Sequence, residues 1–287
     1  MRQECYNCHI RTVENLIEKF EPDQETAELF LKKTHGLLDN NSELSNPVLA
    51  TEIHRLARKT INHHNLYEEE KNRSNSLLLE QYPYFEKLVR EHPSPRHLAA
   101  KLAVAGNIID YGAHTVREDI RLQIEELITN ELCIDERNTL FIEAEKADSV
   151  LYIGDNAGEI VFDRLFIETL QHPDLTYAVR GTPVINDVTL EDTKQTGLDS
   201  ICRILPNGYD APATILECCS DTFIHAFTHA GLVIAKGQGN FESLMHADHR
   251  NLFFMLMAKC QPIADLLGVE VGDMLIMRNR SVKQEDL

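Results

Sequence analysis

The chain has 287 residues, enough for one large domain or two smaller ones. Hydrophobic residues make up 43% and charged residues 26%, values typical of folded proteins, which excludes a disordered or low-complexity chain. The formal net charge of −18 argues against a general nucleic-acid binder, because an acidic surface repels the phosphate backbone. An anionic ligand would therefore need local positive charge from a metal ion, a helix N-terminus or a well-placed lysine.

The first residues contain no apolar stretch after the basic Arg2, so they lack the pattern of a secretory signal. No run of residues approaches the ~18 apolar residues of a membrane span. Seven cysteines, an odd number scattered through a long chain, do not form a disulfide pattern. We therefore expect a cytoplasmic protein with reduced cysteines and no membrane contact.

Residues 1–146 are predicted to form a helical subdomain, because apolar residues recur at helical spacing, as in 13–20 and 53–61. Prolines at positions 22, 47, 93 and 95 fall between these periodic segments, where they end one helix or open the next. The run Glu68-Glu69-Glu70-Lys71 is interpreted as a solvated helix face.

Residues 147–287 are predicted to form an α/β domain, because short apolar runs rich in β-branched residues alternate with helical stretches. The expected strands are 149–153, 175–179, 201–205, 232–235 and 274–277, and the expected helices are 159–170, 211–219 and 241–257. This alternation indicates a mostly parallel sheet covered on both faces. Ligands of such sheets bind beyond the carboxyl ends of the strands.

Polar residues follow the first two of these strands. Asp155 and Asn156 stand in Gly154-Asp155-Asn156-Ala157-Gly158-Glu159, and Asp187 follows the next apolar run. Each of them has a competing role as a helix cap. Carboxylate and amide oxygens from adjacent strand ends also form an incomplete coordination set for a hard divalent cation, with places open for water and substrate.

A lysine, Lys236, directly follows the strand at 232–235 and precedes two glycines and a helix. Its charge together with exposed backbone N–H groups would suit an oxyanion. The order of residues does not match a nucleotide-binding P-loop, and a solvent-exposed lysine is the alternative interpretation.

These segments together resemble the metal-dependent damage-control phosphatases, formerly called domain of unknown function eighty-nine. The resemblance covers nearly the whole chain and rests on motifs in order along it: Cys5-x-x-Cys8, as in the prokaryotic branch, Ala105-Gly106-Asn107-Ile108-Ile109-Asp110, residues 154–163, Pro183 to Thr189, Asp210-Ala211-Pro212 and Lys236 to Glu242.

The resemblance implies an N-terminal helical part packed on a Rossmann-like α/β/α part, and one divalent metal ion (Mn, Co, Ni or Mg) at the strand ends. Asp155, Asn156 and Asp187 match the family's metal ligands. The substrate is expected to contact the residues that match the other motifs: Asn107, Asp110, Lys236, Gly237, Asn240 and Glu242. The chain lacks the Arg-Thr-x-Lys signature of the eukaryotic sugar-phosphate branch, which leaves the phosphorylated metabolite open.

The predicted activity is metal-dependent hydrolysis of small phosphate esters, with Asp155 and Lys236 as catalytic residues. We expect direct attack by water, because the Asp-x-Asp of phosphatases that form a phosphoenzyme is absent after the first strand. Two alternatives stay open: an S-adenosylmethionine-dependent methyltransferase and a non-catalytic protein that binds a metal or metabolite. The oligomeric state and the role of Cys5 and Cys8 are not predicted.

Overall fold

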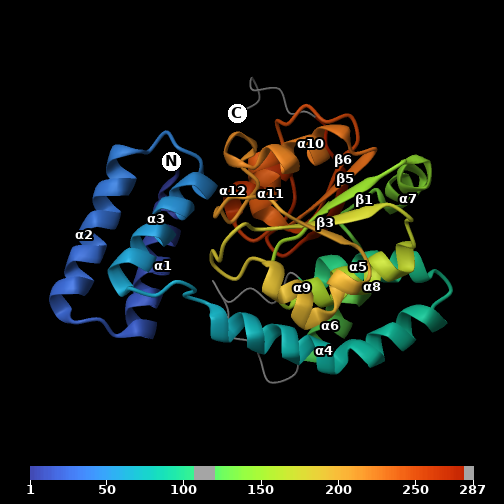
Figure 1. The fold of residues 1–287 in the computed structure, drawn as a ribbon, viewed down its shortest axis with the longest axis horizontal. Coiled ribbons are helices and arrows are strands. Elements are labelled where there is room, and N and C mark those ends of the chain that lie inside the picture. Colours follow the sequence, from blue (N-terminus) through green and yellow to red (C-terminus); the bar gives the residue numbers. More distant parts are fainter. Residues whose placement is uncertain (107–119, 281–287) are drawn as a thin grey trace.

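The computed structural model describes residues 1–106 and 120–280, and in this part of the chain a seven-stranded sheet is combined with helices. Figure 1 shows two parts: the first three helices stand together on the left, and the sheet with its covering helices forms the rest. Asn107 and Asp110, two of the predicted substrate ligands, lie outside the described residues.

The first part is a three-helix unit of α1 (Gln3–Phe20), α2 (Gln24–Asn40) and α3 (Asn46–Ile61). Its apolar stripes pack into a hydrophobic core of their own, which includes Val13, Phe30 and Ile53. Both helices predicted here, 13–20 and 53–61, are confirmed within α1 and α3.

The next helices cover one face of the sheet together with α8 (Glu159–Leu170), and they share its hydrophobic core. They are α4 (Glu68–Glu91), α5 (Pro95–Ala105), α6 (Ile120–Thr129) and α7 (Arg137–Lys146). A short strand from the predicted helical half, β1 (Ile134–Asp135), also joins the sheet. The proposed boundary between residues 146 and 147 thus runs between elements that pack on one core, whereas α1 to α3 have a separate one.

The central strands are parallel, as predicted: β2 (Val150–Ile153), β3 (Leu175–Val179), β4 (Arg203–Pro206), β5 (Leu232–Lys236) and β6 (Leu252–Met257). The order across the sheet is β1-β7-β6-β5-β2-β3-β4, and β7 (Met274–Arg278) runs antiparallel to β6. Because β2 has β3 on one side and β5 on the other, the chain reverses its direction of travel across the sheet at β2, where α/β proteins bind ligands.

The second face of the sheet is covered by α10 (Asp221–His229), α11 (Gly237–Leu244) and α12 (Gln261–Leu267), with a hydrophobic core between them and the strands. Figure 1 shows these helices on the opposite side of the sheet from α4, α5 and α8, while α9 (Leu190–Thr196) follows β3. The three layers confirm the predicted α/β/α fold class.

Two predicted helices were wrong. Residues 241–257 contain the end of α11 and then β6, whose six apolar residues are all buried. A short apolar run buried on both faces has no periodicity that separates strand from helix. Residues 211–219 hold only a 3₁₀ turn, Leu216–Cys218, and α10 begins after Ser220, whose side chain accepts a hydrogen bond from the Phe223 backbone N–H.

The acidic run at the start of α4 is solvated only in part. Lys71 is buried and forms an ion pair of 2.7 Å with Asp192 of α9. The predicted exposed face is therefore wrong for this residue, because α4 packs against α9 there.

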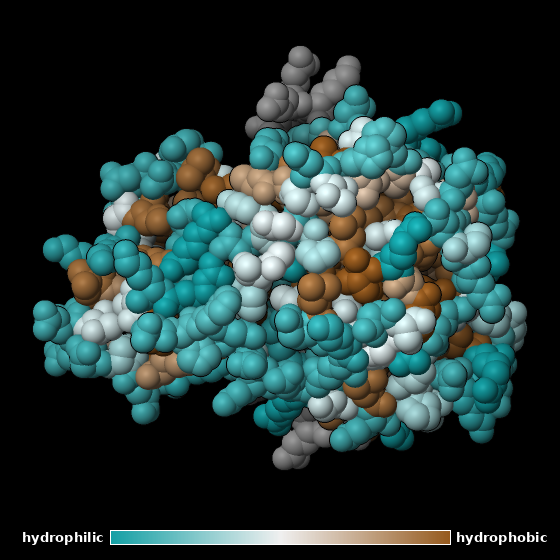
Figure 2. Space-filling model, viewed as in Figure 1, coloured by the Kyte–Doolittle hydropathy of each residue, from teal (hydrophilic) through white to brown (hydrophobic). Residues whose placement is uncertain are grey.

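One face of the molecule shows how hydrophilic and hydrophobic residues are distributed over the surface. The face in Figure 2 is mostly hydrophilic, and its hydrophobic residues lie chiefly over the half that contains the sheet. Among residues 1–106 and 120–280, no helix is both long and apolar enough to span a membrane.

Candidate metal and phosphate site

Strand register places three residues side by side at the carboxyl edge of the sheet. Ile153 at the end of β2 pairs with Ala178 of β3 and Ala235 of β5. Two residues beyond each of these positions are Asp155, Arg180 and Gly237. The sheet itself therefore aligns a carboxylate, a guanidinium and a glycine at the switch point.

The loops that follow β2 and β3 are held together by a short antiparallel bridge between Asn156 and Asp187. The backbone N–H of Val188 donates to the carbonyl oxygen of Asp155 at 2.8 Å, and that of Ala157 donates to Asn186 at 2.8 Å. This pairing brings the three predicted metal ligands, Asp155, Asn156 and Asp187, into one place.

Gly237 is required by the position of the Asp155 carboxylate. A Cβ atom on Gly237 would lie 1.8 Å from Oδ2 of Asp155, far inside van der Waals contact. The glycine also has a φ of +76°, in the left-handed region that side chains disfavour. The predicted role of Gly237 in contacting substrate is untested, and its observed contact is with a predicted metal ligand.

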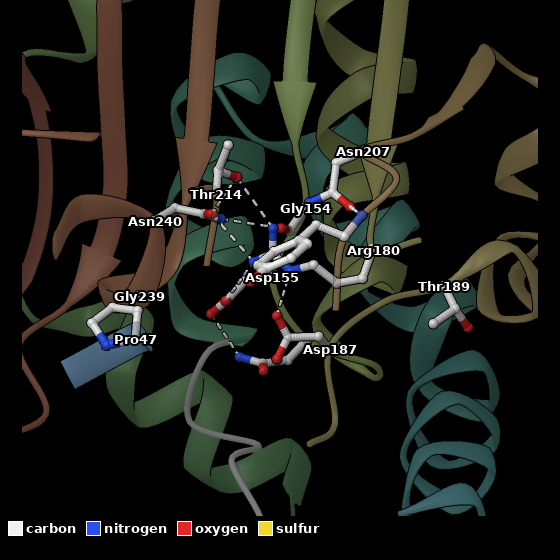
Figure 3. A network of polar contacts seen from close by, with 12 residues as sticks. Pro47, Gly154, Asp155, Arg180, Asp187, Thr189, Asn207, Thr214, Gly239 and Asn240 are labelled. Carbon is white, nitrogen blue, oxygen red and sulfur yellow. Dashed lines mark hydrogen bonds and ion pairs between the residues drawn. The ribbon is translucent and has the colours of Figure 1, made fainter. Parts of the chain in front are cut away.

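Arg180 is a buried anchor for these acidic residues, with 1% of its side chain exposed. Its Nε donates to Oδ2 of Asp187 at 2.6 Å, and its two Nη atoms donate to Thr214 and Asn240 at 3.2 Å each (Figure 3). Its Nη2 also lies 4.0 Å from Oδ1 of Asp155. The guanidinium of Arg180 is therefore paired with a carboxylate of the protein itself.

The electrostatics of the site favour a bound cation. Burial, together with the negative charges of Glu159 and Asp187, raises the pKa of Asp155 to about 8, although Lys259 and Arg180 act in the opposite direction. Two carboxylates and an amide are hard oxygen donors of the kind that divalent cations prefer. They fit such an ion as an incomplete set that leaves places for water and substrate. The part of the chain that the structure describes holds no group of three or more His, Cys, Asp and Glu side chains arranged for a metal.

These donors open into a pocket of about 330 Å³ between the sheet edge and α1. Asp155, Asn156 and Asp187 lie on the sheet side, and the wall contributed by the three-helix unit includes Cys5-x-x-Cys8. Further lining residues are His9, Asn46, Gln238, Glu242, Lys259 and Cys260.

Lys236 lies on the other side of the strand end and does not line this pocket. Its ammonium is fully buried and donates to Oε1 of Glu159 at 2.5 Å, to Oδ1 of Asp163 at 2.5 Å and to the carbonyl of Ala103 at 2.8 Å. The side chain points toward α5 and α8, so the predicted contact between Lys236 and a phosphate has no support from this geometry.

The two remaining residues of the Lys236–Glu242 motif differ in position. Asn240 is buried: it donates to the carbonyls of Lys236 and Gly154 at 2.7 and 3.2 Å, and it accepts from Thr214 at 2.8 Å. It therefore joins the ends of β2 and β5. Glu242 lines the pocket and accepts hydrogen bonds from Gln238 and Asn46, and burial raises the pKa of its carboxyl group.

Sequence reasoning missed Lys259, a cation of the pocket wall. Its backbone N–H donates to the side chain of Gln238 at 2.9 Å, and its charge lowers the pKa of Asp155. Lys259 follows β6 at the same sheet edge as Asp155. A lysine shortly after a buried strand is the pattern that singled out Lys236, and Lys259 has the same pattern. It was missed because the sequence analysis predicts a helix over residues 241–257, which contain β6.

The fold is that of an α/β protein, and the pocket lies at the switch point of its sheet, where proteins of this architecture bind ligands. The family model of the damage-control phosphatase ARMT1-like domain matches residues 1–275. The chain therefore belongs to the ARMT1-like damage-control phosphatase family.

Individual relatives are similar over most of the length of this chain. An uncharacterized protein of Methanocaldococcus jannaschii is 33% identical over 97% of this chain and 95% of its own length. A damage-control phosphatase of Archaeoglobus fulgidus is 34% identical over 80% of this chain and 81% of its own. The crystal structure of a DUF89 family protein of Pyrococcus horikoshii superimposes with a TM-score of 0.89 at 30% identity, covering 98% of this chain and 99% of that one.

Proposed function

We propose that this protein is a divalent-metal-dependent phosphomonoester hydrolase that acts on small phosphorylated metabolites. The observation that carries the proposal is the convergence of Asp155, Asn156 and Asp187 from two bridged loops into one pocket at the sheet edge. Membership in a family of damage-control phosphatases supports the reaction class. Nothing in the fold or the comparisons favours the methyltransferase alternative.

In the proposed site, the side chains of Asp155, Asn156 and Asp187 would hold one divalent ion, with Mn, Co, Ni and Mg as candidates. When bound, the ion supplies positive charge for a phosphoryl oxygen and lowers the pKa of a coordinated water. Arg180 keeps the carboxylate of Asp187 in place through its 2.6 Å hydrogen bond. Gly237 gives the carboxylate of Asp155 room.

A second positive charge near the phosphate is assigned to Lys259, which lines the pocket close enough to Asp155 to affect its pKa. A lysine in this position would neutralise phosphoryl oxygens during transfer. Lys236 stays a predicted phosphate ligand only by its motif, since its ammonium is held by Glu159 and Asp163.

The substrate is proposed to be small. A pocket of about 330 Å³ has room for a phosphorylated metabolite, including a sugar phosphate. Glu242 lines it, and a carboxyl group there would interact with substrate hydroxyls. Asn107 and Asp110 remain predicted contacts on the basis of their motif.

The reaction is proposed to proceed by direct attack of water. The water oxygen forms a new bond to phosphorus, the ester P–O bond breaks, and the alcohol leaves with a proton that derives from the water. Asp155 would serve as a metal ligand in this route. A covalent phosphoenzyme trapped on Asp155 would overturn it in favour of nucleophilic catalysis.

The proposal is tested with metal-stripped full-length protein, an aryl phosphate and a panel of sugar phosphates, each assayed with Mn²⁺, Co²⁺, Ni²⁺ and Mg²⁺. Phosphate release that a metal restores supports the proposed activity. Tight binding of a metabolite without turnover under every condition would instead indicate a non-catalytic binding protein.

A further inference from the structure

A group of buried charges lies directly behind the proposed metal ligands, and it has no part in the mechanism above. Its members are the side chains of Glu159, Asp163 and Lys236, which we call the buried triad; none of the three is exposed. An ammonium has three hydrogens, and the acceptors from Glu159, Asp163 and Ala103 account for all of them.

One end of the buried triad is fixed by aromatic residues. The hydroxyl groups of Tyr152 and Tyr177 donate to the two oxygens of Asp163 at 2.6 and 2.8 Å. The two rings stack with centroids 5.3 Å apart. Asp163 is thereby held rigidly, and it in turn fixes the ammonium of Lys236.

The other end of the buried triad reaches the metal ligands through Asn156. The amide Nδ2 of Asn156 donates to Oε2 of Glu159 at 3.2 Å and to Oδ2 of Asp155 at 2.7 Å. An amide nitrogen has two hydrogens, so both are engaged. The amide oxygen is then the atom that this side chain has left for a cation in the pocket.

We propose that Glu159 is a positioning residue that sets the amide orientation of Asn156, and that Lys236 serves this role by holding the Glu159 side chain in place through its 2.5 Å hydrogen bond to Oε1. Both side-chain oxygens of Glu159 act as acceptors, Oε1 from Lys236 and Oε2 from Asn156. An accepting Oε2 admits one orientation of the amide: nitrogen toward Glu159, oxygen toward the pocket. This inference rests on the proposed function, because the ion to be held is the one proposed there. It also explains why a lysine in the phosphate-site motif points away from the pocket.

The variant Glu159→Gln tests the role most directly. A glutamine can donate as well as accept, so Asn156 is free to turn its oxygen toward residue 159. The charge balance tolerates the change, because Lys236 and Asp163 remain as a pair. Asp163→Asn removes the same charge from the same triad without touching Asn156, and it is the matched control.

The measurement is the Kd for Mn²⁺ alone on metal-free protein, followed by electron paramagnetic resonance, with urea unfolding of each variant in parallel. We expect Glu159→Gln to weaken Mn²⁺ binding about 10- to 100-fold and Asp163→Asn by no more than about 3-fold. If Glu159→Gln does not fold, Glu159→Asp decides, since it keeps the charge but withdraws the carboxylate from Asn156 by one methylene.

Wild-type affinity in the Glu159 variant, or an equal loss in Asp163→Asn, would overturn the inference and leave the proposed function standing. If the wild-type protein binds none of Mn²⁺, Co²⁺, Ni²⁺ and Mg²⁺, the proposed function fails, and this inference fails with it.

Discussion

Arg180 and Asp187 form an ion pair of 2.6 Å in which 1% and 4% of the two side chains are exposed. The same guanidinium also reaches Thr214 and Asn240, so one residue joins a predicted metal ligand to the ends of three strands. A buried charge that loses its partner is costly, which makes Arg180 a sensitive point of the whole site.

We expect Arg180→Gln to lower the free energy of unfolding by about 3–5 kcal/mol, because the buried carboxylate of Asp187 would lose the positive charge of its ion pair. Arg180→Lys keeps the charge but lacks the planar fork, and it should restore only part of the loss. Urea denaturation of both variants measures the effect. A change below about 1 kcal/mol for Arg180→Gln would show that Asp187 does not depend on this pair.

Gly237→Ala is expected to destroy the metal site, since the new Cβ would fall 1.8 Å from Oδ2 of Asp155. Gly268→Ala is the matched control: Gly268 also has a positive φ, +68°, but nothing lies within 4 Å of its Cβ position. In both variants, an alanine in the left-handed backbone region lowers the free energy of unfolding by about 1 kcal/mol. Only Gly237→Ala should lose Mn²⁺ affinity in a binding titration, and equal affinities in the two variants would contradict the close contact with Asp155.

His54 is expected to make the protein sensitive to acid. It is buried in α3, and burial, with smaller effects from Arg58 and His9, lowers its pKa to about 3. Between about pH 3 and pH 6.5 the unfolded chain therefore binds more protons than the folded one, so this contribution to stability is complete above about pH 6.5 and is lost as the pH falls.

The loss attributable to His54 amounts to about 2 kcal/mol at pH 5. His54→Gln cannot take up this proton, so its stability should fall less than that of the wild type between about pH 7 and pH 5. Urea midpoints at the two pH values measure the difference. Parallel decreases in both proteins would assign the acid sensitivity to other groups.

Lys259→Met is expected to reduce kcat/KM for a phosphate ester about 100-fold and to weaken inhibition by inorganic phosphate, because the pocket would lose a positive charge near the phosphoryl group. Lys259→Arg should recover part of the activity. Steady-state kinetics with an aryl phosphate test this, and unchanged inhibition by phosphate in Lys259→Met would remove the residue from the site.

The predicted metal ligands could be found from sequence because parallel strands end at one edge of a sheet. Asp155 and Asp187 each follow an apolar run, and the structure places them in one pocket. The direction of Lys236 could not be found in this way. All five residues of β5 are buried, so no alternation of polar and apolar residues tells which face of the sheet the lysine meets.

The spacing of apolar residues predicted the fold class correctly, but it did not predict every helix and strand. β6 is apolar throughout and lies in the middle of the sheet, where a strand and a buried helix look alike in sequence. That single error concealed Lys259. The wall that α1 contributes to the pocket depends on tertiary packing of the three-helix unit, for which Cys5-x-x-Cys8 gave no local signal.

The central claim is that Asp155, Asn156 and Asp187 hold one divalent ion on which phosphate-ester hydrolysis depends. It is tested by adding Mn²⁺ stepwise to metal-free wild type and to Asp187→Asn, while bound Mn²⁺ and phosphate release are followed in the same samples. The account predicts that turnover rises in proportion to bound Mn²⁺ up to one ion per chain in the wild type, and that the variant shows neither at the same Mn²⁺ concentrations. Full turnover by the metal-free wild type, or by Asp187→Asn, would contradict it.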